Sequence, residues 1–521
     1  MERRTFLKIL SSAGIVSLVS PTFAMEVCKN KVSKSSSALL ESAFRNPPFS
    51  SGVYTWWHWM NGNITKDGIT RDLEAMKANG IAGYQLFEAG SGIPIGPVES
   101  LSDEWVDLIL HTLKESERLG LEFAMHNCPG WSSSGGPWIT PDKAMQIITW
   151  SETKITGGKQ VRIQLPTPKH MFDYYIDTYC LAIPANMKVI PRLSILELSN
   201  RLDKDGVLTW DVPTGEWLIM RFGQTAKDQK NKSAPSKSTG LDCDKFSTEA
   251  LDYHLNCMFK RLMPAMEKIA KHSKIGLLID SYETGDQDWT SDMPAYFEQS
   301  HGYELYPFLP VLANKIVESE ESTKRFLFDF RRVRADMFAE RYYGHFQKRC
   351  KEKGIITYTE PYGGNMMEEL QVAQQLDINM GEFWCGQTVL WANYKYNRTV
   401  KQVASIAHTL GGKVVGAEAF TSEPDADKWL QYPYALKSLG DYMFTRGLSR
   451  IYFHRFAHQP HPTAAPGMTM GAWGLHFDRT NTWWKPGKAW IEYLNRCQYI
   501  FQSSTFYGDI LYHNGDDSFG S

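Results

Sequence analysis

The sequence has few of the features that mark proteins that bind nucleic acids, span membranes or hold metal ions through cysteine thiolates. Lys and Arg number 56 against 58 Asp and Glu, a formal net charge of −2, so no broad basic surface is available to hold nucleic acid. After residues 1–24, no apolar run is long enough to span a bilayer stably. The eight cysteines stand singly, without a CxxC pair or a disulfide framework, so we expect most of them to be buried thiols.

The N-terminus has the pattern of an export signal. ERRTFLK resembles a twin-arginine motif, and the apolar stretch ILSSAGIVSLV that follows it is short for a membrane anchor. Small residues in PTFA predict cleavage near Ala24. We therefore expect residues 1–24 to be a twin-arginine-like or Sec signal, and the product to be periplasmic or secreted.

Strand-like and helix-like segments alternate over residues 50–136 and again over 241–500. With 521 residues the chain exceeds one compact core, so two or more domains are expected. Helical spacing is clearest in SDEWVDLILHTLKESERLG and over roughly Arg331–Lys353. The strand candidates are GVYTWWHW, IAGYQLFEAG, LEFAMHNCPGW, IGLLID, IITYTEP, INMGEFW, KVVGAEAFT and RIYFHRF.

Eight such strands, most followed by a helix, predict an α/β fold: a (β/α)₈ TIM-type barrel. A doubly wound open sheet is the competing fold. It is less favoured because no glycine-rich phosphate loop follows the first strand.

Over residues 137–240 the spacing of apolar residues changes to every second position, with Gly and Pro turns between the apolar runs. This predicts an inserted all-β domain after strand 3, ending in the polar tract Thr225–Gly240, which we expect to be a flexible linker. Residues 501–521 are expected to begin a truncated C-terminal β region.

Polar and acidic residues gather where the predicted strands end, which is where the active sites of such barrels lie. A single Glu at a strand end is more often a cap or an ion-pair partner, but several acids on one rim repel each other, and that is costly without a function. In chain order these residues are His58, Asn61, Glu88, His126, Asn127, Trp131, Asp280, Glu283, Glu360, Glu382, Trp384, Glu418 and His454.

Such a rim suits two kinds of chemistry. Glycoside hydrolysis needs one protonated carboxyl group and one ionised carboxylate, beside aromatic and hydrogen-bonding groups for the sugar. A hard cation such as Ca²⁺ would use the remaining carboxylate oxygens. Zinc is less favoured, because HRFAHQPH lacks the HExxH spacing. In YTWWHWMNGNIT, neighbouring residues of a strand face opposite sides, so Trp56, Trp57 and Trp59 are expected to divide between core and pocket wall.

Taken together, YTWWHWMNGNIT, GYQLFEAG, HNCPGWSSSGGPW, TGLDCDKFS, IDSYETG, GEFW and GAEAFT resemble glycoside hydrolase family 106, the α-L-rhamnosidases. The resemblance runs from about Ser50 to the C-terminus. It implies calcium-dependent, inverting removal of terminal α-L-rhamnose from plant-type oligo- or polysaccharides or other rhamnosides, by a barrel with β-rich insertions. Relatives usually continue into further β-sandwich domains.

Carried over by motif, Glu283 matches the family's general acid and Glu418 its general base, although the two labels could be exchanged. Glu382 matches an acid beside the calcium. The remaining rim residues are expected to contact the sugar: His58, Asn61, Glu88, His126, Asn127, Trp131, Glu360, Trp384 and His454.

Two other functions stay open. One is a barrel glycosidase of different sugar specificity, and the other is a truncated, inactive carbohydrate-binding relative. The second would be indicated by loss of one acid of the pair, and both Glu283 and Glu418 are present.

Overall fold

The computed structural model describes residues 34–90, 92–132, 134–385, 389–422, 428–471 and 474–513. The chain divides into two compact units, Met1–Pro48 and Phe49–Ser521. In the first unit the described element is helix α3 (Lys34–Arg45), where Arg45 pairs with Glu41 one turn earlier. The predicted export signal, residues 1–24, lies outside the described residues, as do residues 514–521 of the region expected at the C-terminus.

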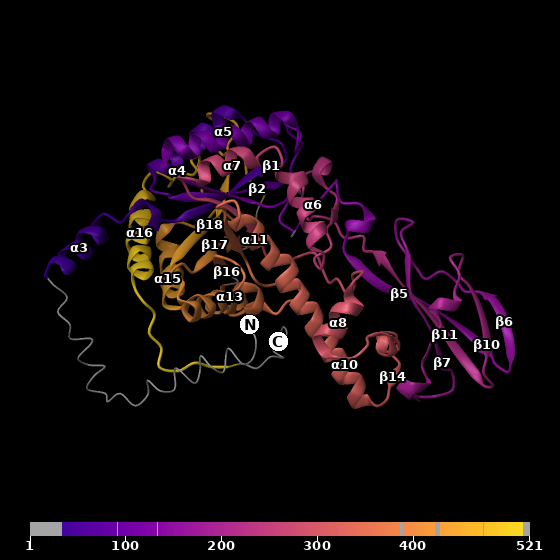
Figure 1. The fold of residues 1–521 in the computed structure, drawn as a ribbon. Helices are drawn as coiled ribbons and strands as arrows, with labels where there is room; N and C mark the ends of the chain where they lie inside the picture. Colours follow the sequence, from indigo (N-terminus) through magenta and orange to yellow (C-terminus); the bar gives the residue numbers. More distant parts are fainter. Residues whose placement is uncertain are drawn as a thin grey trace. The chain divides into compact units, whose positions relative to one another are not determined.

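The second unit contains a closed barrel of eight parallel strands, as the sequence predicted (Figure 1). Around the barrel the strands follow the order β1-β18-β17-β16-β15-β13-β3-β2. They are buried almost throughout, which explains their continuous apolar character. Their bounds are β1 (Tyr54–Met60), β2 (Gly83–Ala89), β3 (Glu122–His126), β13 (Ile275–Ile279), β15 (Ile356–Thr359), β16 (Ile378–Cys385), β17 (Gly416–Ser422) and β18 (Arg450–Ala457).

Helices follow most barrel strands and have ordinary capping signals. Thr65 caps α4 by accepting a hydrogen bond from the amide of Gly68, and Ser102 caps α5 in the same way. Gly120, at φ 66°, ends α5 in the left-handed conformation that glycine adopts without strain. The described α-helices of this unit are α4 (Lys66–Ala78), α5 (Asp103–Leu119), α6 (Thr248–Phe259), α7 (Met263–Ala270), α8 (Met293–His301), α9 (Leu309–Leu312), α10 (Glu320–Met337), α11 (His345–Lys351), α12 (Glu369–Ala373), α13 (Val389–Leu410), α15 (Pro433–Thr445) and α16 (Lys488–Ser503).

One helix begins earlier than its sequence pattern indicated. The predicted helix over roughly Arg331–Lys353 is α10, which starts at Glu320, then a π-helical turn over Phe338–Gly344, then α11. Ser319 caps the start by accepting from the Ser322 amide. The first turns of α10 are rich in charged residues, so its apolar face is not evident from the sequence pattern. None of the helices among the described residues has the length and apolar character to cross a membrane.

Between β3 and β13 the chain forms mostly antiparallel strands. One sheet has the order β5-β11-β7-β9 and another pairs β10 with β6. Short pairings join β12 to β4 and β8 to β14 (Ile316–Val317), which lies after β13. Phe49–Ser521 form one compact unit, so the strands are observed but a separate domain is not. The strands are β4 (Gly135–Gly136), β5 (Gln146–Thr156), β6 (Lys159–Gln164), β7 (Ile176–Pro184), β8 (Val189–Ile190), β9 (Leu196–Glu197), β10 (Val207–Val212), β11 (Glu216–Ala226) and β12 (Leu241–Asp242).

The polar tract Thr225–Gly240 is folded against the barrel rather than forming the expected flexible linker. Asn231 is 2% exposed. Its side-chain amide donates to the carbonyls of Pro129 and Ser238 at 3.0 Å each, and its side-chain oxygen accepts from the Gly240 amide at 2.8 Å. One buried side chain thus satisfies a backbone group in the loop after β3 and two within the tract, and this fixes the path of the tract.

Candidate active site

A cavity of about 650 Å³ lies at the carboxyl ends of the barrel strands. Its walls combine four carboxyl groups with aromatic rings and a few apolar side chains. The described lining residues are Trp56, His58, Gly92, Ile93, Trp131, Lys232, Ser233, Asp280, Ser281, Glu283, Glu382, Trp384, Glu418, Thr421, His454, Met470 and Gly471.

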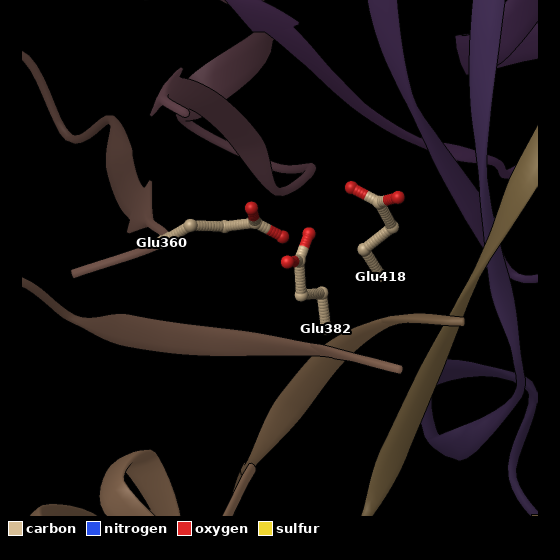
Figure 2. Close-up of side chains that lie close together, drawn as sticks. All are labelled: Glu360, Glu382 and Glu418. Atoms are coloured by element: carbon tan, nitrogen blue, oxygen red, sulfur yellow. The ribbon is translucent and has the colours of Figure 1, made fainter. Parts of the chain in front are cut away.

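Three of the predicted acids converge from neighbouring strands. Glu382 on β16 is the register partner of Glu418 on β17, and Glu360 directly follows β15. All three are buried, and one carboxylate oxygen from each lies within 4.8 Å of the others. Figure 2 shows the carboxyl groups turned toward one common space. Carboxylate oxygens at this spacing are the kind of ligand that hard cations bind in proteins.

Burial and mutual repulsion oppose ionisation of these acids. The pKa of Glu418 is raised to about 8, chiefly by burial, against a hydrogen bond from Thr421 that lowers it and with a smaller rise from the Glu283 carboxylate. Burial, and then the charge of Glu418, holds the pKa of Glu382 and of Asp280 well above the usual range. For Glu360 the main causes of a raised pKa are burial and then the charge of Asp280.

Within the described residues little positive charge offsets this group. His454 lies beside Glu418, with its Nδ1 3.6 Å from Oε1. Burial, followed by the nearby Arg455, holds the pKa of His454 well below its usual range, so the ring is neutral near pH 7. The Tyr362 hydroxyl donates to Glu360 at 2.5 Å. The four acids with raised pKa values, Asp280, Glu360, Glu382 and Glu418, therefore need either shared protons or a bound cation.

Glu283 has a different environment from the buried acids. Its side chain is 36% exposed. Lys232 Nζ donates to Oε2 at 2.6 Å, and Trp131 Nε1 donates to the same oxygen at 3.1 Å. Glu283 and Glu418 line the same cavity, and the charge of Glu283 contributes to the raised pKa of Glu418.

The aromatic stretch of β1 divides as its alternation predicted. Trp57 and Trp59 pack edge to face at 5.6 Å in the core outside the barrel. Trp56 and His58 face the cavity, where Trp56 lies 4.4 Å from the ring of Phe87 and His58 stacks on the same ring at 5.1 Å. One side of the strand therefore supplies packing, and the other supplies the pocket wall.

The structure places the remaining predicted residues in two groups. His58, Trp131, Trp384 and His454 line the cavity with Glu283, Glu382 and Glu418. Four others are buried beside it and bonded within the protein. Asn61 donates to the Ile93 carbonyl at 2.6 Å, Ser100 donates to Glu88 at 2.8 Å, His126 Nδ1 lies 2.9 Å from the Cys128 carbonyl oxygen, and Asn127 donates to the Leu278 carbonyl at 2.9 Å.

Several lining residues were absent from the predicted site. Thr421 follows Glu418 by three residues and had a local signal in its strand-end position. Lys232 and Ser233 had none, because the polar tract that carries them reaches the cavity only through long-range contacts.

The fold is a closed (β/α)₈ barrel, and carboxyl groups cluster in an aromatic-walled cavity at the carboxyl ends of its strands. This is the architecture of a glycoside hydrolase. The sequence model of the glycoside hydrolase 106 family, described as alpha-L-rhamnosidase, matches residues 45–179 and 169–519. The chain belongs to this family, as its motifs predicted.

Two relatives add detail. A protein of Formosa agariphila named "Putative beta-glucuronidase" is 40% identical over 510 residues, which is 92% of this chain and 43% of that protein. The solved structure of a rhamnosidase from Novosphingobium sp. PP1Y matches with a TM-score of 0.82 and 25% identity, over 89% of this chain and 60% of that one. The chain thus spans less than two thirds of the length of either relative.

Proposed function

We propose that this protein is exported and removes terminal α-L-rhamnose from oligo- or polysaccharides by an inverting mechanism. The observation that carries the proposal is that Glu283 and Glu418, from β13 and β17 ends 135 positions apart in sequence, line one cavity with aromatic walls. An inverting enzyme needs two carboxyl groups roughly 6.5–9.5 Å apart, on opposite sides of the sugar, with room for water between them and the anomeric carbon.

In the proposed reaction Glu283 is the general acid. It gives its proton to the glycosidic oxygen as the bond from that oxygen to the anomeric carbon breaks. Glu418 is the general base, which takes a proton from the water that attacks the same carbon from the other face. Trp131, which donates to Glu283, holds the carboxyl group in place at the rim.

We further propose that Glu360, Glu382 and Glu418 hold a calcium ion. Three buried oxygen donors within 4.8 Å fit such an ion, and Glu360 Oε1 is buried without a hydrogen-bond partner among the described residues. When bound, the ion would neutralise the cluster and so favour the ionised form of Glu418.

The cavity that Glu283 and Glu418 line would hold the sugar that is removed. It suits a neutral deoxy sugar better than a glucuronide, the substrate class in the Formosa relative's name. Four carboxyl groups line the cavity and would repel a uronate, whereas Ile93 and Met470 offer apolar contact to the methyl group of rhamnose. The described lining contains one Lys or Arg, Lys232, and that side chain is paired with Glu283.

The test is turnover of an aryl α-L-rhamnoside and an aryl β-D-glucuronide, each with calcium or with a chelator. We expect rhamnoside hydrolysis that the chelator suppresses, with the β-anomer of rhamnose as the first product by NMR. Glu283→Gln and Glu418→Gln should each lower kcat by at least about 10²-fold, whereas the exposed Glu321→Gln should not. Turnover of the glucuronide alone, or full activity in either cavity variant, would contradict the proposal.

A further inference from the structure

Strand β17 is irregular directly after the proposed general base. Ala419 lies opposite Phe383 of β16, as a regular parallel register requires. The next residue of β16, Trp384, lies opposite Thr421, so the register skips Phe420. One extra residue in one strand of a pair is a β-bulge. The φ angle of Phe420 is 62°, a left-handed backbone conformation that bulky residues rarely adopt.

The bulge changes which side chains enter the cavity. In a regular strand the residue two places after Glu418 would face the cavity with it, and the residue three places after would face outward. Here Ala419 and Phe420 both pack in the core outside the barrel, and Thr421 lines the cavity beside Glu418. The bulge thus keeps a phenyl ring out of the cavity and brings a hydroxyl group into it.

The surrounding packing holds this strained residue in place. The ring of Phe420 lies 4.9 Å from that of Phe383 and 5.5 Å from that of Trp490 on α16. The Phe420 carbonyl oxygen accepts a hydrogen bond from Cys385 Sγ at 3.2 Å. A Cβ at Gly440 on α15 would come within 3.1 Å of the Phe420 ring, so glycine gives this ring room. Bulges beside active sites re-aim side chains, and strained backbone is concentrated at such sites.

Thr421 is the side chain that the bulge brings to Glu418. Its hydroxyl group donates a hydrogen bond to Glu418 Oε1. Thr421 is 3% exposed and β-branched, which restricts its rotamers, so the position of this donor is well defined. Within the described part of the chain no hydrogen bond reaches Oε2. One carboxylate oxygen of Glu418 is therefore held, and the other is open to a ligand.

We propose that Thr421 is a positioning residue for the reaction, because it holds Oε1 of Glu418 so that Oε2 faces the water that attacks the anomeric carbon. This inference rests on the proposed function, since it takes Glu418 as the general base. The side chain of Glu418 has several rotatable bonds, and displacement of a reacting group by about 1 Å can slow a reaction about 10²-fold. Loss of the threonine hydroxyl should therefore change kcat rather than substrate binding.

Kinetics with an aryl α-L-rhamnoside at saturating calcium test the positioning. We expect Thr421→Val, which keeps the shape of the side chain but loses its hydroxyl group, to lower kcat about 10- to 100-fold with little change in KM. Thr421→Ala loses the same hydroxyl group and gives the readout if the valine variant does not fold. Thr421→Ser keeps the donor and should recover most of the lost kcat.

The matched control is Thr112→Val, because Thr112 is also buried but donates to the Leu108 carbonyl within α5. It should leave kcat unchanged. Wild-type kcat in the valine and alanine variants of Thr421, or a serine variant as slow as these two, overturns the proposal. A change confined to KM overturns it as well, because Thr421 would then bind the sugar instead of orienting Glu418.

Crystal structures separate this inference from the function beneath it. We expect the Glu418 carboxyl group to leave its wild-type position in Thr421→Val and to keep it in Thr421→Ser. A carboxyl group that stays in place in the valine variant overturns the proposal, whatever the kinetics. If Thr421→Val keeps full kcat while Glu418→Gln loses it, the positioning role is wrong and the rhamnosidase function stands. If the wild type does not hydrolyse the rhamnoside, that function fails, and the crystal structures alone decide whether Thr421 positions Glu418.

Discussion

Removal of the cation from the acid cluster should change the pH dependence of activity as well as its level. In the metal-free protein, burial raises the pKa of Glu418 to about 8. A general base must be ionised, and at pH 7 only about one tenth of a carboxyl group with that pKa is ionised, rising to about nine tenths at pH 9. A calcium ion against Glu360, Glu382 and Glu418 would keep the base ionised at both pH values.

The measurement is kcat/KM with chelator divided by kcat/KM with calcium, across pH 6 to 9.5. Division cancels the titration of the general acid, which is common to both. We expect a ratio of about 0.1 at pH 7 that rises toward one as the pH passes 8. A ratio that does not vary with pH would refute the assignment of Glu418 as a base controlled by the cation.

Thermal and urea unfolding give a second readout of the same titration. The folded pKa of Glu418 lies above its unfolded value of 4.5, so the folded state holds the extra proton between pH 4.5 and 8. The titration of Glu418 should therefore lower the free energy of unfolding of the metal-free protein as pH rises through that window, by at most about 5 kcal/mol, since one pKa unit is about 1.4 kcal/mol. The raised pKa values of Asp280, Glu360 and Glu382 act in the same direction. Calcium should remove most of this fall. A flat profile in chelator would contradict the raised pKa.

Two further predictions concern buried acids outside the cluster. Burial raises the pKa of Glu88 to about 7 from 4.5, so the contribution of the protonated Glu88 to stability is lost as pH rises across that range. In urea unfolding, the free energy of unfolding of Glu88→Gln should gain up to about 3 kcal/mol over that of the wild type between pH 4.5 and 8. A difference that stays constant with pH would refute this. Asp72 is fully buried and accepts from His458 at 2.8 Å and Arg479 at 2.7 Å. Asp72→Asn should cost about 3 kcal/mol or more because it leaves Arg479, 14% exposed, without its carboxylate partner. The exposed Asp67→Asn on the same helix should cost less than about 1 kcal/mol, and similar losses would contradict that reasoning.

The barrel strands could be predicted because their signal is local. A strand buried on both faces is a continuous apolar run, and IGLLID, for example, coincides with Ile275–Ile279 of β13. The acids at the strand ends could be predicted for the same reason, since Glu382 and Glu418 lie within their strands and come together through register. The start of α10 was missed because Ser319 and the charged turns after it give only a weak helical pattern.

Contacts between distant segments could not be predicted in the same way. Asn127 stands at a strand end like a substrate ligand, but its amide donates to the carbonyl of Leu278, 151 residues away. Lys232 stands in a tract that looks like a linker, and it reaches Glu283 because Asn231 fixes the tract beside it. In both cases the partner is set by the fold, so the sequence shows a polar residue but not what it contacts.

The division of roles between the two catalytic candidates follows from the same limit. Burial favours a neutral carboxyl group, which is the form a general acid needs, so burial alone would assign the acid to Glu418 rather than to Glu283. The opposite assignment holds only if positive charge at the cluster of Glu360, Glu382 and Glu418 reverses that preference. The proposed cation is therefore required by the assignment of acid and base. If the protein is fully active at pH 7 in the absence of any divalent ion, Glu418 is the acid, and the leaving group lies on its side of the sugar.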